Sequence, residues 1–259
     1  NAYFPPDDGL GDRALAIRTK LDDLEGFGLN TAPALVALNT VEVDDWESAW
    51  KAFFKPRRYG AIMVTPSWEP VPDDAPEAVV VLDPGLAFGT GSHASTRLCL
   101  QELEGLGLRD ARVADVGAGS GILTIAAVKL GARCVHAVDV DDRAVEVATQ
   151  NITANSVEDR VQLQIGTIDQ LTGPFDIVLM NILAGVIMDA LPTVMQRLSP
   201  GGRAVFSGIT EFEAADVAAA LDAEGFEQIS APTLEGWTAF VASRPHCTTD
   251  HETTEGHRT

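Results

Sequence analysis

Three glycines and one distant aspartate form the pattern in this sequence that most directly indicates chemistry. Gly117, Gly119 and Gly121 alternate with other residues directly after an apolar run, and Asp139 ends the next apolar run. Glycine lets the backbone lie against a ligand because it has no side chain. A carboxylate about 20 residues further on can accept hydrogen bonds from the hydroxyl groups of a ribose. The pattern therefore predicts a site for an adenosine-type ligand.

The helix predicted at residues 122–130 is expected to contribute backbone groups to this site. It begins directly after Gly121. The first N–H groups of a helix have no partner within the helix and favour a negative group, so we expect them to face the ligand. Ile122 stands where the dinucleotide fingerprint needs glycine or alanine, which disfavours a nicotinamide cofactor. A glycine-rich turn that binds no ligand is the alternative.

Two further segments carry polar groups that a parallel sheet could bring to the same edge. A glycine-rich run at residues 82–93 contains Phe88 and Gly89, and Thr96 follows it on the first turns of a predicted helix. Asn181 directly follows an apolar strand, where its amide could both accept and donate hydrogen bonds. The alternatives are an ordinary capped turn for the first segment and a helix-capping asparagine for the second.

The elements that would position these residues are short apolar strands that alternate with helices. Strands are expected at 35–43, 61–64, 79–82, 112–116, 134–138, 161–165, 175–180, 203–207, near 228 and at 237–242, and helices at 14–24, 44–54, 95–104, 122–130, 142–155, 186–198 and 211–224. We expect the alternation to begin with the strand at 79–82. It is typical of an α/β fold with a mainly parallel sheet that is covered by helices on both faces.

Composition limits the class of protein. The 259 residues carry a formal net charge of −20, which argues against a strongly basic nucleic-acid surface. The acidity could steer a basic protein substrate, or it could suit a high-salt host. No apolar run is long enough to predict a membrane span. Cys99, Cys134 and Cys247 lack metal-ligand spacing, so we expect free buried thiols in a reducing cytosol and no metal site.

Taken together, the motifs resemble those of the ribosomal protein L11 methyltransferase family, PrmA. The resemblance covers about residues 44–242. It rests on LDPGLAFGTGSH at 82–93 with the following Thr96, DVGAGSGILTIAAVKLGA at 115–132, the strand end at Asp139, NILAG at 181–185 and SGI at 207–209. The long glycine segment is specific to the family, whereas DVGAGSG alone marks only the wider superfamily of S-adenosylmethionine-dependent methyltransferases.

The resemblance implies a Rossmann-like class I methyltransferase whose last strand is antiparallel and whose cofactor is S-adenosylmethionine. The expected reaction transfers methyl groups to lysine side chains and the α-amino group of ribosomal protein L11, in the cytoplasm, by a monomer without direct nucleic-acid contact. Asn181 is the expected catalytic residue, beside the methyl group and the entering amine. The residues expected to contact the cofactor are Phe88, Gly89, Thr96, Gly117, Gly119, Gly121, Asp139 and Asn181.

The chain departs from the family pattern in two places. Residues 93–96 read His-Ala-Ser-Thr where the family has His-Pro-Thr-Thr. The family's ferredoxin-like substrate domain is matched only in its second half, so either upstream residues are missing from this sequence or substrate recognition has changed. The expected organisation is a partial substrate domain at 1–43, a helical linker at 44–76, the methyltransferase domain at 77–245 and a disordered tail at 246–259.

Other functions and residue roles stay open at this point. The chain could methylate lysines of a different protein, act as a non-catalytic S-adenosylmethionine-binding module on the ribosome, or be a nicotinamide oxidoreductase. No dedicated base is expected, because a dry crevice favours the neutral amine. His93, the only histidine near the motifs, is either a general base or a loop-packing or capping residue. Trp237 either walls the crevice or packs in the core.

Overall fold

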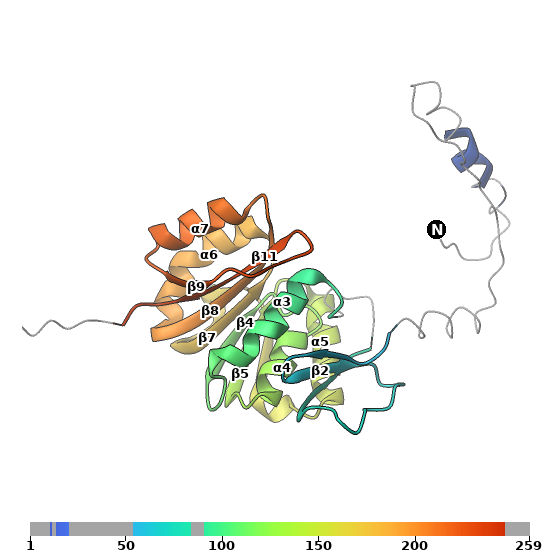
Figure 1. Ribbon diagram of the computed structural model, residues 1–259, viewed down its shortest axis with the longest axis horizontal. Helices are drawn as coiled ribbons and strands as arrows, with labels where there is room; N and C mark the ends of the chain where they lie inside the picture. Colours follow the sequence, from blue (N-terminus) through green and yellow to red (C-terminus); the bar gives the residue numbers. More distant parts are fainter. Residues whose placement is uncertain (1–10, 12–13, 21–53, 84–90, 247–259) are drawn as a thin grey trace, which may run out of the picture. The chain divides into compact units, whose positions relative to one another are not determined.

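The computed structural model describes residues 11, 14–20, 54–83 and 91–246 (Figure 1). The chain divides into two compact units, Asn1–Phe53 and Phe54–Thr259. In the first unit, residues 14–20 are helical, within the helix expected there. Most of the expected front domain, Phe88, Gly89 and the tail from residue 247 lie outside the described residues, and the expected division into four segments stays a prediction.

The second unit is built on an eight-stranded sheet. Its strands are β4 (Arg112–Val116), β5 (Cys134–Asp139), β6 (Val161–Ile165), β7 (Phe175–Asn181), β8 (Leu198–Thr210), β9 (Glu227–Ser230), β10 (Thr233–Leu234) and β11 (Trp237–Ser243). Five strands run parallel in the order β6-β5-β4-β7-β8, and β11 is antiparallel to β8, with β9 and β10 paired to β11. The predicted α/β class with an antiparallel last strand is confirmed.

Helices cover both faces of this sheet (Figure 1). The helices are α3 (Ala94–Leu103), α4 (Ile122–Lys129), α5 (Asp142–Ala154), α6 (Ala184–Arg197) and α7 (Ala214–Ala223), with short 3₁₀ turns η1 (Glu104–Leu106), η2 (Glu158–Arg160) and η3 (Ile168–Gln170). Val113 packs in the core with α3, α4 and α5, and Ala114 packs with α6 and α7, because successive side chains of a strand point to opposite faces. None of the described helices has both the length and the apolar character that a membrane span requires.

The helix predicted at 211–224 begins three residues later than expected. The Glu213 carboxylate accepts hydrogen bonds from the N–H and the hydroxyl of Thr210, at 3.0 and 2.7 Å. These bonds close a turn at the end of β8, so α7 starts only at Ala214. The N–H of Glu213 also donates to the carbonyl oxygen of Thr210 at 3.0 Å, and a Glu that reaches back to the N–H of a Thr three residues earlier is typical of the start of a helix.

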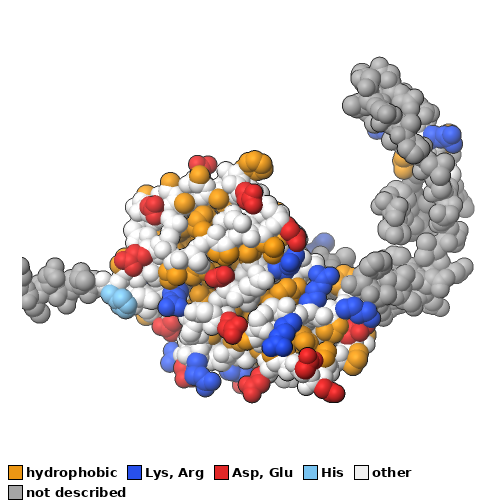
Figure 2. All heavy atoms as spheres, in the orientation of Figure 1, with side chains coloured by type: hydrophobic (Ala, Val, Ile, Leu, Met, Phe, Trp, Pro, Cys, Tyr) orange, Lys and Arg blue, Asp and Glu red, His pale blue; other side chains and the backbone are white. Residues whose placement is uncertain are grey.

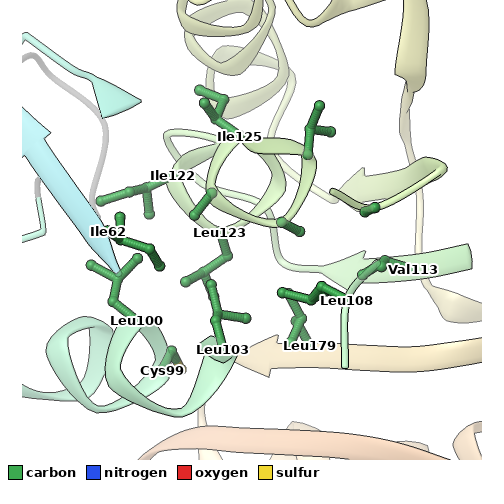
Figure 3. Packing of buried hydrophobic residues seen from close by; sticks show 14 of the residues in the cluster. Ile62, Cys99, Leu100, Leu103, Leu108, Val113, Ile122, Leu123, Ile125 and Leu179 are labelled. Atoms are coloured by element: carbon green, nitrogen blue, oxygen red, sulfur yellow. The ribbon is translucent and has the colours of Figure 1, made fainter. Parts of the chain in front are cut away.

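The strand predicted at 79–82 belongs to a separate sheet, so the expectation that it opens the main α/β alternation is wrong. This sheet has three strands: β1 (Arg57–Tyr59), β2 (Ile62–Thr65) and β3 (Ala78–Val81). It packs on α4, and Ile62 lies beside Leu100 and Ile122 in a shared core (Figure 3). Residues 122–128 of α4 are all buried because the helix is covered on both sides. An apolar strand pattern does not say which sheet the strand joins.

The end of α5 fixes the edge of this small sheet. Asn155 is buried, its Oδ1 accepts a hydrogen bond from the N–H of Val81 at 2.8 Å, and its Nδ2 donates to the carbonyl oxygen of Val81 at 2.7 Å. The side-chain amide thus pairs with the free backbone N–H and C=O groups of the edge strand β3, as the backbone of a neighbouring strand would. The small sheet is thereby tied to the helix that follows β5.

We predict that Asn155→Ala destabilises the fold by about 1–3 kcal/mol, because it leaves the backbone groups of Val81 without their partner. Urea unfolding of the full chain measures the change. Gln150→Ala, at an exposed position of the same helix, is the control for helix propensity. Equal midpoints for the two variants would contradict the assigned contact.

Candidate functional site

A pocket opens at the carboxyl ends of the parallel strands. Its volume is about 710 Å³, within the roughly 300–1,000 Å³ typical of small-molecule sites. β4 and β7 are neighbours there although β5 and β6 come between them in the chain, so the strand order reverses. Ligands of open α/β sheets bind at such reversals. The pocket brings together residues singled out from the sequence: His93, Thr96, Gly117, Gly119, Asp139, Asn181 and Trp237.

Gly121 has a different position from the other two glycines of the turn at 117–121, which we call the glycine turn. It does not line the pocket but precedes α4, with a φ of 80°. A Cβ at Gly121 would lie 3.3 Å from the Cβ of Ala148 on α5. Glycine at this position therefore lets α4 and α5 pack closely.

The glycine turn is closed onto the end of β5. The N–H groups of Gly117 and Ala118 both donate to the carbonyl oxygen of Val138, at 2.8 and 3.0 Å. The N–H of Gly119 donates to Oδ2 of Asp139 at 2.8 Å. The expectation of free N–H groups therefore does not extend to the turn itself. A turn that binds phosphate needs free backbone N–H groups, and these three N–H groups already have partners. The glycine turn can therefore lie close to a ligand but does not supply groups that bind an anion.

Asn181 and Thr96 lie together at the pocket. Nδ2 of Asn181 donates to Oγ1 of Thr96 at 3.1 Å, which joins the end of β7 to the first turn of α3. Thr96 is buried and Asn181 is half-buried. Because the amide nitrogen faces Thr96, the amide oxygen Oδ1 faces elsewhere and can accept a hydrogen bond from another donor. The arrangement gives the pocket one oriented acceptor.

His93 caps α3 beside the pocket. Its Nδ1 accepts a hydrogen bond from the N–H of Ser95 at 3.3 Å and lies 2.8 Å from Oγ of Ser95. Its ring meets the ring of Trp237 edge to face, with 4.6 Å between the centroids. The capping interpretation of His93 is confirmed, and Trp237 contributes to the wall of the pocket.

Asp115 supports the turn from beneath the surface. It is 1% exposed, and its Oδ2 accepts a hydrogen bond from Oγ1 of Thr124 at 2.6 Å. Burial raises the pKa of Asp115 to about 6, the bond from Thr124 opposes that rise, and the charge of Asp139 adds to it. Asp115 does not line the pocket. It joins β4 to α4, the two elements that the glycine turn connects.

The described cysteines do not line the pocket. Cys99 is fully buried, and burial raises the pKa of its thiol to about 12. A thiol of such pKa is not a nucleophile at neutral pH. Cys134 is half-buried, and both are free. The expectation of free buried thiols is confirmed for Cys99, Cys134 is free but not fully buried, and Cys247 lies outside the described residues.

Several apolar side chains that line the pocket were not predicted from the sequence. They are Val140, Ile168, Leu183 and Val186, and the first and third are each 74% exposed. Val140 directly follows Asp139, and Leu183 comes two residues after Asn181. A large apolar residue just past the polar end of a strand is the signal that could have found them, because exposed apolar groups gather at ligand-binding grooves.

Comparison with known proteins identifies the family. Residues 2–245 match the family model of ribosomal protein L11 methyltransferase (PrmA). The chain belongs to this family. A ribosomal protein L11 methyltransferase of Symbiobacterium thermophilum is 40% identical over 248 residues, covering 95% of this chain and 80% of that protein. One from Pelobacter propionicus is 41% identical over 249 residues, covering 94% of this chain and 81% of that protein.

Solved structures agree with the PrmA assignment. The crystal structure of a ribosomal protein L11 methylase from Lactobacillus delbrueckii subsp. bulgaricus aligns with a TM-score of 0.70 and 33% identity, over 74% of this chain and 100% of that chain. The [4+2]-cyclase SpnF aligns with a TM-score of 0.51 at 13% identity. The latter likeness concerns the fold alone, since one fold can host unrelated reactions.

The described residues fit S-adenosylmethionine, the methyl donor of PrmA enzymes. The donor is a sulfonium cation without phosphate groups. Correspondingly, the described residues that line the pocket include three aspartates, Asp139, Asp169 and Asp189, and neither lysine nor arginine. The N–H groups of Gly117, Ala118 and Gly119 already have hydrogen-bond partners, which also favours a ligand without phosphate groups. A dinucleotide would bring a pyrophosphate to donors that are already used.

The raised pKa of Asp115 predicts a pH-dependent stability. The folded state binds this proton more tightly than the unfolded state, whose value is near 3.8. The stabilisation is complete below that value and is lost as the pH rises through about 6. Asp115→Asn stays neutral, so it should gain up to about 3 kcal/mol relative to the wild type between about pH 4 and pH 7. Urea unfolding at several pH values measures this, and a pH-independent difference would contradict it.

A second prediction concerns the space at Gly117. This residue has a φ of +79°, and a Cβ there would collide with Cγ2 of Ile182, whereas Gly107 has a φ of +74° with nothing within 4 Å. Alanine at either position should cost roughly 1–2 kcal/mol of stability through left-handed strain. Only Gly117→Ala should also weaken S-adenosylmethionine binding in calorimetry. Equal S-adenosylmethionine affinity in the two variants would contradict a role of Gly117 in cofactor binding.

Proposed function

We propose that this chain transfers methyl groups from S-adenosylmethionine to lysine side chains and the α-amino group of ribosomal protein L11. The observation that carries the proposal is the bond from Asn181 to Thr96 at the pocket of a PrmA family member, which engages the amide nitrogen and leaves the amide oxygen as an acceptor. The names of the relatives supply the substrate. Membership in the PrmA family and the three aspartates that line the pocket support S-adenosylmethionine as the cofactor.

Each pocket residue has a role in this proposal. Asp139, at the end of β5, accepts the ribose hydroxyls, in keeping with its place beside Gly119. Gly117 and Gly119 are proposed to admit the ribose and the methionine portion, Gly117 by letting the side chain of Ile182 pack against the glycine turn at the edge of the pocket. Thr96 contributes at the methionine end, next to Asn181. Phe88 and Gly89 belong to the same proposed set, although they lie outside the described residues.

The amine must reach the methyl group in its neutral form. An ordinary lysine has a pKa of about 10.4, so only about one in a few thousand is neutral at pH 7. The apolar side chains at the pocket mouth favour the neutral form by removing water from the amine. Oδ1 of Asn181 then accepts an amine N–H, which aims the nitrogen lone pair along the line of attack. Such positioning supplies roughly 7–11 kcal/mol, and the bound S-adenosylmethionine supplies a methyl group that its positive sulfur already activates.

The proposal extends to the partners and the location of the protein. It acts in the cytoplasm, as a monomer, on a protein rather than on a nucleic acid, and residues 1–43 contribute to substrate recognition. The net charge of −20 supports the absence of nucleic-acid binding. On the face in Figure 2, acidic side chains lie among the basic ones, so no broad field of positive charge faces the viewer.

Labelling of a total ribosomal-protein extract tests the substrate. The full chain is incubated with the extract, taken from cells that lack the enzyme, and with methyl-labelled S-adenosylmethionine. The proposal expects label on the L11 band, at lysine and α-amino nitrogens located by mass spectrometry. Label on a different band alone would show that the chain methylates another protein. Cofactor binding without label anywhere would favour a non-catalytic module.

Asn181→Ala should lower the turnover number more than it lowers S-adenosylmethionine affinity. The reason is that the amide oxygen is proposed to contact the amine in the transition state, and loss of such an interaction lowers kcat and kcat/KM together. A loss of about 100-fold in kcat is expected from lost orientation. Calorimetry and single-turnover labelling separate the two quantities. Unchanged turnover would reduce Asn181 to a structural residue.

A further inference from the structure

The strand end that carries Asn181 is fixed by two residues of β8 that have no role in the proposed chemistry. Ser207 pairs with Asn181 in the parallel ladder of β7 and β8. The carbonyl oxygen of Ser207 accepts a hydrogen bond from the N–H of Ile182 at 3.1 Å. At Gly208, a Cβ would lie 3.0 Å from the carbonyl carbon of Ile182 and closer still to its oxygen. Only glycine lets β8 approach the turn after β7 this closely.

The side chain of Ser207 reaches in the other direction, to α3. Its Oγ donates to the carbonyl oxygen of Ser95 at 3.0 Å, and both serines are buried. Ser95 directly precedes Thr96. Ser207 therefore makes two bonds: its backbone carbonyl bonds Ile182, which follows Asn181, and its side chain bonds Ser95, which precedes Thr96. These two bonds flank the 3.1 Å contact between Asn181 and Thr96 on both elements.

We infer that Ser207 is a positioning residue for methyl transfer, and that Gly208 allows the close approach on which its backbone contact depends. The bond from Ser207 to α3 sets the spacing between Thr96 and the end of β7, and through Thr96 it sets the direction of Oδ1 of Asn181. Ser207 does not line the pocket, so it acts only through these neighbours. The inference rests on the proposed function, because it takes Asn181 as the residue that orients the amine.

Kinetics of Ser207→Ala in the full chain test the inference. The variant keeps the backbone contacts and loses the side-chain bonds to Ser95 and to the Cys99 thiol, both on α3, so kcat for methylation of ribosomal protein L11 should fall about 10- to 100-fold through misplacement of the amide. The S-adenosylmethionine dissociation constant and the KM for L11 should stay near the wild-type values. Val205→Ala is the matched control, because Val205 is buried on the same strand and the same face. It should lose stability but keep kcat.

A double-mutant cycle separates positioning from general destabilisation. If Ser207 acts through Asn181, then Ser207→Ala should add little to the loss of kcat in an Asn181→Ala background, because coupled residues are not additive. Additive losses would overturn the inference. A loss of kcat in Val205→Ala as large as in Ser207→Ala would overturn it as well.

Side-chain amide resonances of Asn181 provide a readout that does not depend on turnover. The Nδ2 protons should exchange slowly with solvent in the wild type and in Val205→Ala, and faster in Ser207→Ala. Absence of L11 methylation by the wild type would refute the proposed function, and the exchange rates would still decide whether Ser207 positions the amide. Equal exchange in all three proteins would refute the positioning role.

Discussion

The pocket depends on a backbone constraint at the glycine turn. The turn is short, its N–H groups bond to Val138 and Asp139 on β5, and the side chain of Ile182 occupies the place where a Cβ of Gly117 would lie. The loop is therefore closed against its neighbours before any ligand arrives. The glycine turn contributes to binding by leaving the pocket open at the carboxyl edge of the sheet. Its bond to Asp139 holds the carboxylate of that residue at the wall of the pocket.

The polar groups of the pocket come from separate segments that the fold brings together. Asn181 and Thr96 are 85 residues apart in the chain and 3.1 Å apart at their polar atoms. The contact forms because the first turn of α3, which carries Thr96, lies at the carboxyl end of β7, where Asn181 stands. The bond between Asp115 and Thr124 joins β4 to α4, and the small sheet packs on α4. The result is a site with aspartates, an oriented amide and apolar walls, which suits a cationic methyl donor and a neutral amine.

Local patterns in the sequence predicted the α-helices and most of the strands from residue 112 onward, including all five parallel ones, because each is a buried apolar run or a capped helical stretch, but they missed β10 and gave only residues 203–207 of β8. They also placed Asp139 and Asn181 at strand ends. They could not assign β3 to its sheet, since Ala78–Val81 reads like any buried strand and its pairing depends on β2. The role of Gly121 depends on Ala148 of a later helix. Such contacts arise from tertiary packing between distant segments, so no local residue pattern in the sequence predicts them.

The structure of the full chain with bound S-adenosylhomocysteine tests the central claim most directly. The account predicts that the ribose hydroxyls contact the carboxylate of Asp139 and that the sulfur faces Asn181, with Oδ1 of that residue open to an entering amine. A complex in which the ribose avoids Asp139, or in which the sulfur points toward Asp169 and away from Asn181, would contradict it.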